Sequence, residues 1–200
     1  KAFIEAGVKK GDRVAMLSMA RTEFPITYMA ANKIGAIWLG LNPKFTLEEL
    51  RFQLNDSKPT VLVAVRDFMG NDLSETIKTL TGECPSIKKL LVIGDPMEGS
   101  EDYAEFIGKP RADLDRELER RAAAVNGKDS ALLMYTSGST GKPKGVVHTH
   151  YSIIENIKVE VERFYFGQGW KVLLHFPINH VAADVEIGYA AIMMGGCMVC

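Results

Sequence analysis

Short apolar runs alternate with segments of helical period along most of this 200-residue chain. The runs are too short for buried helices, and no hairpin dipeptide such as Asn-Gly joins them, which favours strands connected by helices. Strands are expected at residues 13–18, 37–42, 60–65, 89–93 and 131–135. Helices are expected at residues 1–6, 23–34, 46–55, 72–80 and 113–125. This order predicts an α/β fold, a mostly parallel β-sheet layered with helices.

Local signals sharpen several of these elements. Thr46 followed by Glu49 forms a capping box that opens the helix at 46–55. Residues 60–65, TVLVAV, are continuously apolar, which indicates a strand buried on both faces. Residues 94–112 are rich in glycine, proline and acidic groups, and we expect an irregular surface segment there. The helix at 23–34 is expected to place Phe24, Tyr28 and Met29 on one side.

Composition excludes several classes of protein. There are 24 Lys plus Arg against 25 Asp plus Glu, a formal charge of −1, so neither nucleic acid nor an acidic membrane is an expected partner. The weakly charged stretch 187–200 is too short for a transmembrane segment, which needs about 20 residues. Three cysteines make no disulfide framework, which favours a reducing, cytoplasmic location. We expect Cys197 and Cys200 to be buried packing residues rather than a redox or metal pair.

One segment concentrates hydroxyl groups, glycines and lysines directly after a predicted strand. Residues 131–150 read ALLMYTSGSTGKPKGVVHTH. Glycines at 138, 141 and 145 let backbone amides approach a ligand closely, and the hydroxyls and lysines add donors and positive charge. Such a loop at the carboxyl end of a strand is typical of phosphate binding.

The spacing of this loop excludes the two common nucleotide-binding motifs. A Walker A loop has four residues between its glycines and a Ser or Thr after its lysine, whereas Gly138 and Gly141 are separated by two residues and Pro143 follows Lys142. G-x-G-x-x-G does not fit because residue 140 is threonine. A flexible Gly/Ser linker is the alternative. Paired lysines around a proline, directly beyond an apolar strand, favour phosphate binding over a linker.

Residues Tyr135–Gly145, YTSGSTGKPKG, resemble the phosphate-loop motif of the adenylate-forming (AMP-binding) superfamily. That superfamily comprises acyl- and aryl-CoA synthetases, peptide-synthetase adenylation domains and luciferases. The resemblance extends upstream through residues 7–50 and downstream through HFPINHVAA and GYAAIMMGGCMV. It implies part of a large N-terminal domain, with residues 1–155 as a first subdomain and 156–200 as the start of a second, acyl-binding subdomain.

The resemblance also implies a two-step ligation of the acyl-CoA synthetase type, an acid–thiol ligase. A carboxylate attacks the α-phosphate of ATP to give an acyl-adenylate and pyrophosphate, and the thiol of CoA then displaces AMP. The implied partners are a small-molecule carboxylate, ATP with Mg²⁺, and CoA, and a homo-oligomer is allowed. Catalytic roles are implied for Lys144 and His180, with Thr136 as a Mg²⁺ ligand. The implied phosphate-binding residues are Thr136, Ser137, Gly138, Ser139, Thr140, Gly141, Lys142 and Lys144.

Of the two lysines, the resemblance favours Lys144 for direct phosphate contact, with Lys142 exposed. His180, in PINH, matches a position where CoA ligases place a histidine near the acyl carbonyl, where it orients the carboxylate. From the residues alone, a partly buried structural histidine is the alternative. His148 and His150 are expected to seat the loop on the sheet, and His175 to lie in an apolar strand.

No acid–base pair is expected near His180. Ser152 and Glu155 have the spacing of a capping box for the next helix. Asp184 and Glu186 are the nearest carboxylates in sequence, and nothing pairs them as acid and base.

The sequence begins at Lys1 without Met and stops at Cys200 inside an apolar run, so we expect a piece of a longer protein that is inactive alone. The family's adenine, ribose and C-terminal lysine motifs would follow residue 200. Two alternatives to the CoA ligase remain. One is a peptide-synthetase adenylation domain, disfavoured because PINHVAAD lacks the usual Phe-Asp; the other is a non-catalytic nucleotide-binding protein, if the natural chain ends near residue 200.

Overall fold

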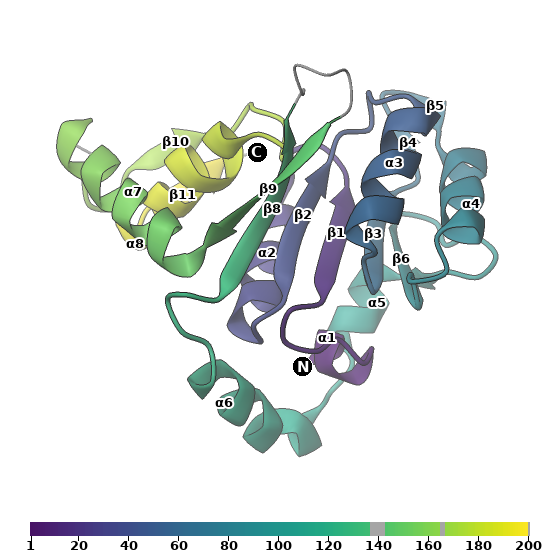
Figure 1. The fold of residues 1–200 in the computed structure, drawn as a ribbon, viewed down its shortest axis with the longest axis horizontal. Coiled ribbons are helices and arrows are strands. Elements are labelled where there is room, and N and C mark those ends of the chain that lie inside the picture. The colour runs from purple at the N-terminus through teal and green to yellow at the C-terminus, as the bar shows by residue number, and fades with distance from the viewer. Residues whose placement is uncertain (137–142, 165–166, 200) are drawn as a thin grey trace.

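The computed structural model describes residues 1–136, 143–164 and 167–199. Its main sheet has seven strands in the order β7-β6-β3-β1-β2-β8-β9 (Figure 1). Neighbouring strands are parallel except β8 and β9, which are antiparallel. The strands are β1 Arg13–Leu17, β2 Ile37–Leu41, β3 Val61–Val65, β6 Lys89–Ile93, β7 Glu101–Asp102, β8 Ser130–Thr136 and β9 Lys144–Thr149. The predicted α/β class is confirmed.

Helices cover both faces of this sheet. In Figure 1, α3 (Leu47–Ser57) and α4 (Ser74–Glu83) lie in front of the strands, and α2 (Glu23–Lys33) passes behind them. Side chains alternate along β1: Val14 and Met16 join the cluster on the α2 side, whereas Ala15 and Leu17 join the cluster on the α3 and α4 side. A strand between two apolar layers must be apolar on both faces, as β3 is throughout and β1 is from Val14 to Leu17.

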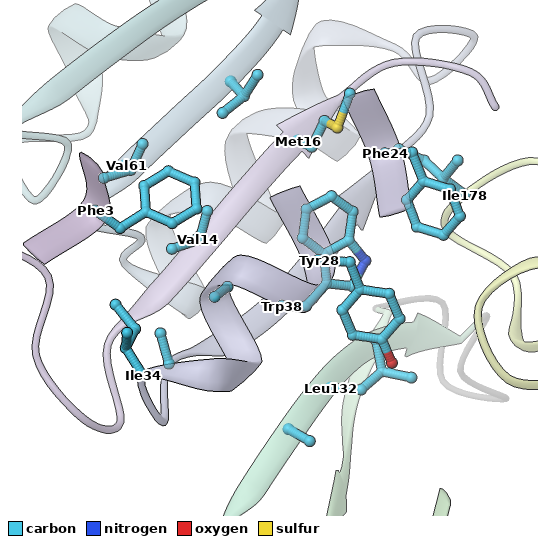
Figure 2. Packing of buried hydrophobic residues seen from close by; sticks show 14 of the residues in the cluster. Phe3, Val14, Met16, Phe24, Tyr28, Ile34, Trp38, Val61, Leu132 and Ile178 are labelled. Carbon is cyan, nitrogen blue, oxygen red and sulfur yellow. The ribbon is translucent and has the colours of Figure 1, made fainter. Parts of the chain in front are cut away.

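Aromatic packing joins α2 to β2 on the rear face. Phe24 and Tyr28 from α2 pack on Trp38 of β2, with ring centroids 5.6 and 5.3 Å from it (Figure 2). All three side chains are almost fully buried. The prediction that Met29 shares this side is wrong, since it is 42% exposed. A residue one position beyond Tyr28 is turned by about 100° around the helix, away from the stripe.

Helix α3 is confirmed as the sequence predicts. The Thr46 hydroxyl accepts from the amide of Glu49 at 3.3 Å, and the Glu49 carboxylate accepts from the amide of Thr46 at 2.8 Å. This reciprocal capping box satisfies two amides that the first turn leaves free. The remaining early helices are α1 Ala2–Glu5, α5 Tyr103–Gly108, the short 3₁₀ turn η1 Ala112–Leu114 and α6 Asp115–Ala123.

The prediction of an irregular surface segment at 94–112 is wrong. The segment contains β7 and α5, and Asp102 caps α5 by accepting from the amide of Glu105 at 2.7 Å. Tyr103 and Phe106 are buried in the rear cluster, three residues apart on one face of the helix. A short amphipathic helix therefore lies within a segment whose composition is typical of a loop.

After β9 the chain forms α7, His150–Arg163, which begins earlier than expected. Its capping box pairs Thr149 with Ser152, so Ser152 is the third helical residue and not the cap, and the predicted pairing with Glu155 is wrong.

Beyond α7, β10 (Lys171–Leu173) and β11 (Cys197–Val199) form a separate parallel pair, with the π-helix η2 (Ala182–Tyr189) and α8 (Ala190–Met193) between them. A small hairpin, β4 (Asp67–Phe68) with β5 (Asn71–Asp72), lies after β3.

The cysteines differ in their surroundings. Cys84 is buried, as free cysteines usually are, but Cys197 is exposed, so the prediction that it is a buried packing residue is wrong. In β11, side chains alternate between the two faces of the strand, and Cys197 and Val199 share the exposed one. Cys200 lies outside the described residues.

Among the described helices, none combines the length and apolar character needed to cross a membrane.

Candidate active site

The antiparallel pair β8–β9 holds the two ends of the predicted phosphate loop. Thr136, the last residue of β8, is paired with Lys144, the first residue of β9, and both side chains are exposed. Because β8 is parallel to β2, this pair lies at the edge where the central parallel strands have their carboxyl ends, the edge that binds ligands in open α/β sheets. The predicted loop residues between them, Ser137, Gly138, Ser139, Thr140, Gly141 and Lys142, lie outside the described residues.

The antiparallel partner is the main departure from the predicted sheet. No two-residue turn joins β8 to β9, so the sequence carries no hairpin dipeptide, and the connection is the loop itself. This arrangement differs from a strand–loop–helix nucleotide site because the loop returns into the sheet before α7 begins.

Tyr135 anchors the end of β8 to α3. Its hydroxyl donates to Oδ2 of Asp56 at 2.6 Å, and its ring meets Phe52 edge to face with centroids 6.2 Å apart. Burial, followed by the neighbouring Asp56 carboxylate, raises the pKa of Tyr135 above its usual range, so the hydroxyl stays protonated as a donor. The strand that leads into the loop is therefore fixed to the front layer.

Gly145, one of the three glycines of the predicted loop, has a packing role in the structure. It lies opposite Tyr135 on β9, and a Cβ there would be 3.1 Å from Cδ1 of Leu133 and 3.5 Å from the Tyr135 ring. The absence of a side chain lets the ring cover the strand backbone closely. Gly145 therefore serves packing against Leu133 and Tyr135, a role that the sequence pattern alone does not distinguish from ligand contact.

A cavity of about 420 Å³ opens beside this hairpin. Its described lining residues come from β8, β9 and the segment before η2, and none of them is acidic. The lining residues are Met134, Tyr135, Thr136, Val146, His148, Asn179, His180 and Val181. Two cavities of similar volume, beside Arg111 and beside Arg66, share no lining residue with it. The cavity thus joins two parts of the chain that sequence reasoning singled out separately, the phosphate loop and PINH.

Two backbone amides donate to His180, one to its ring and one to its carbonyl oxygen. The amide of Ala182 donates to Nδ1 of His180 at 3.1 Å, and the amide of Ala183 donates to the His180 carbonyl at 2.9 Å. Since Nδ1 accepts, Nε2 is the ring nitrogen that carries the N–H. The Phe176 ring stacks against the imidazole with centroids 6.2 Å apart. The imidazole is thereby an oriented donor at the cavity wall, suited to a carboxylate or carbonyl oxygen.

His148 and Asn179 are polar cavity residues that were not predicted as site residues. His148 was expected only to seat the loop, but it lines the cavity from β9. His148 follows Lys144 by four positions on β9. Because side chains of a strand alternate between its two faces, both lie on the same face, and this spacing could have identified His148 from the sequence. Asn179, next to His180, has a buried Oδ1 without a hydrogen-bond partner among the described residues.

The other histidines lie outside this cavity. His150 begins α7, and burial lowers the pKa of its imidazole. His175 is exposed beyond β10 and packs on Phe176 at 4.3 Å, so its predicted place in an apolar strand is wrong. Glu186 lies in η2 and does not line the cavity, and the side chain of Asp184 is outside the described part.

The described part of the chain offers little protein coordination for Mg²⁺. It contains no group of three or more His, Cys, Asp or Glu side chains arranged to hold a metal. Thr136 contributes one exposed hydroxyl oxygen at the start of the loop. Mg²⁺ commonly binds substrate phosphates and few protein ligands, so a single hydroxyl fits a metal carried on a nucleotide.

The family model "AMP-binding enzyme" matches residues 1–200. The long-chain-fatty-acid–CoA ligase FadD15 of Mycobacterium bovis is 33% identical over 186 residues, which cover 90% of this chain and 30% of FadD15. The 4-coumarate–CoA ligase CCL1 of Humulus lupulus is 28% identical over 197 residues, covering 96% of this chain and 34% of CCL1. The solved N-terminal domain of FACL13 from Mycobacterium tuberculosis superposes with a TM-score of 0.80 at 26% identity, covering 98% of this chain and 45% of that one.

This chain thus spans about a third of the length of these curated relatives. Its relatives are acyl- and aryl-CoA ligases, and the solved neighbour has the same fold. The family expected from the phosphate-loop motif is confirmed: the chain belongs to the AMP-binding enzymes.

Proposed function

We propose that the protein containing this chain activates a carboxylic acid with ATP and transfers the acyl group to CoA. The observation that carries this proposal is the shared cavity: His180 and the loop-bearing β8–β9 pair line the same 420 Å³ space. A carboxylate bound at His180 would lie next to a nucleotide held by the loop. Attack of the carboxylate oxygen on the α-phosphorus gives the acyl-adenylate and releases pyrophosphate.

The proposed roles of the residues are those that the family resemblance implies, and the charges of the residues support them. The loop 136–144 binds the β- and γ-phosphates, and Lys144 provides positive charge where pyrophosphate departs. Hydrogen-bond donors that already point toward the developing charge stabilise a transition state more than water does, because they need not reorient during the reaction. Thr136 is the proposed protein ligand of Mg²⁺, which would supply further charge neutralisation when bound. His180 donates from Nε2 to a carboxylate oxygen and orients the other oxygen toward phosphorus.

The carboxylate is held next to the polar wall, away from the acidic residues of the chain. Among the described side chains, no carboxylate lines the cavity, so an anion bound there meets no like charge from them. His148 and Asn179 add polar groups to the same wall. The site is therefore suited to an anionic substrate carboxylate beside a polyphosphate.

We propose the domain division 1–155 and 156–200. The seven-stranded sheet ends with β9 at Thr149, and the separate β10–β11 pair begins the next layer. Helix α7 packs on both parts, through Ile153 and Ile157 in the same cluster as Ala183 and Val185. A cytoplasmic location and a homo-oligomer remain predictions for the whole protein.

The test is pyrophosphate exchange by the whole protein with a panel of fatty, aryl and amino acids, followed by addition of CoA. We expect exchange with a fatty or aryl acid and a thioester after CoA. Exchange with amino acids alone would favour the peptide-synthetase alternative. No exchange with bound ATP would favour the non-catalytic alternative.

A further inference from the structure

Gly40 of β2 is in contact with the backbone of the segment that carries His180. A Cβ at Gly40 would lie 2.0 Å from the carbonyl oxygen of Ile178, 2.7 Å from its carbonyl carbon and 3.1 Å from the amide nitrogen of Asn179. Real Cβ atoms do not approach backbone this closely. The segment therefore lies directly on the strand because position 40 has no side chain.

The strand side of this contact cannot move easily. Gly40 is paired with Met16 of β1, and its neighbour Leu39 is paired with both Ala15 and Leu133 of β8. The Leu39 and Leu41 side chains are fully buried on the front face. A shift of β2 would break ladders on both sides, so an added side chain would have to displace the Ile178 segment.

The segment side is fixed at Ile178 and reaches the cavity directly afterwards. Ile178 is fully buried in the same cluster as Trp38 and Phe24 (Figure 2). The next two residues, Asn179 and His180, line the cavity. Displacing the Ile178 carbonyl therefore moves the two residues that face the β8–β9 wall.

We propose that Gly40 is a positioning residue that sets the place of Asn179 and His180 against the phosphate-loop strands. This inference rests on the proposed function for its kinetic consequences, but its geometric part does not. Glycine inside a strand costs stability, so its presence at this position is explained by the close approach. The phosphate loop is attached to β8 and β9, which Gly40 does not displace, so the effect falls on the carboxylate side of the site.

The experiment compares Gly40→Ala with wild type in the whole protein. We expect the KM for the carboxylate to rise and the adenylation rate to fall, together about 10–100-fold in kcat/KM, because catalysis is sensitive to displacements near 1 Å. The KM for ATP should change less than twofold. Gly82→Ala, at a helical position with nothing within 4 Å, is the glycine control and should leave both KM values unchanged.

Two further variants separate positioning from loss of stability. Ile178→Ala removes the buried side chain that holds the segment, changes no residue of β2, and should also raise the carboxylate KM selectively. Leu62→Ala truncates a fully buried residue in the front cluster and should lower stability while leaving the ratio of the two KM values unchanged. If Gly40→Ala and Ile178→Ala raised both KM values equally, or left both unchanged, the positioning role would be wrong.

A second readout does not depend on activity. The ¹⁵N shifts of the His180 imidazole, assigned with a His180→Gln variant, report whether Nδ1 still accepts a hydrogen bond. Gly40→Ala should move them, whereas Gly82→Ala should not. If wild type shows no acid-dependent exchange, the proposed function fails and these shifts decide the inference: a change supports it, and identical shifts overturn it.

Discussion

Tyr135 links β8, the strand that precedes the phosphate loop, to α3 through both its ring and its hydroxyl. The hydroxyl can be removed by substitution while the ring contact is kept. Tyr135→Phe deletes the donor that contacts Asp56 at 2.6 Å and Gln53 at 3.3 Å, and leaves the ring against Phe52 and Gly145. A typical hydrogen bond contributes about 0.5–1.5 kcal/mol net, and bonds to charged groups more. Because Asp56 is exposed, water competes for the carboxylate, and we expect a loss of about 1 kcal/mol in the free energy of unfolding.

The assay is a double-mutant cycle of Tyr135→Phe and Asp56→Ala in the whole protein. The cycle is needed because Asp56 lies in the last turn of α3, where removing a negative charge itself favours the helix. In Asp56→Ala the hydroxyl can still donate to the Gln53 carbonyl, so the coupling energy should be about 0.5–1 kcal/mol. A loss of 1 kcal/mol corresponds to about 2–4 °C in Tm for a cooperative unit of this size.

The same variants also test the connection to the site. If the anchor orders the start of the loop, Tyr135→Phe should raise the KM for ATP, at most about fivefold for 1 kcal/mol, and the carboxylate KM less. A coupling energy below about 0.3 kcal/mol, within the additivity expected of independent sites, would refute the anchoring role.

Three further changes have expected outcomes. Lys144→Ala in the whole protein should mainly lower the rate of adenylation, measured by pyrophosphate exchange, and an unchanged first half-reaction would contradict its role at the phosphates. Thr46→Ala removes the α3 capping box and should lower the free energy of unfolding by about 1 kcal/mol in urea titrations, with Thr22→Ala, where no side-chain cap bond exists, as the control. Burial lowers the pKa of His150 below 6.5, so the folded state binds its proton less tightly than the unfolded state does, and stability should fall as the pH drops below about 6.5. His150→Gln should remove part of this loss in Tm between pH 7 and 5, and parallel Tm curves for the two proteins would contradict it.

Much of the fold could be predicted because the local sequence pattern of most elements matches the surroundings of those elements in the folded protein. The strand β3 is apolar throughout since both of its faces are buried, and the capping box at Thr46 is a local signal that needs no tertiary information. Helix α5 was missed because its amphipathic stripe, Tyr103 and Phe106, is short and lies among loop-forming residues. The pairing of β9 with β8 was missed because the segment 137–143, and not a two-residue turn motif, connects them.

The site could be predicted only where residues are close in sequence. The loop motif located Thr136 and Lys144, but sequence alone could not bring PINH to the same wall, since that contact depends on how α7 returns the chain to the sheet. The contact of Gly40 with Ile178 joins residues far apart in the chain and involves only backbone on the Ile178 side. A backbone contact of this kind has no residue pattern to reveal it.

Transfer of ¹⁸O from the substrate carboxylate tests the central claim most directly. The whole protein is incubated with ATP and an ¹⁸O-labelled carboxylic acid that supports exchange, then with CoA, and AMP, pyrophosphate and phosphate are analysed by mass spectrometry. Attack of the carboxylate on the α-phosphorus predicts one ¹⁸O atom in each AMP formed and none in pyrophosphate. Label in inorganic phosphate together with ADP would show attack at the γ-phosphorus and contradict the account.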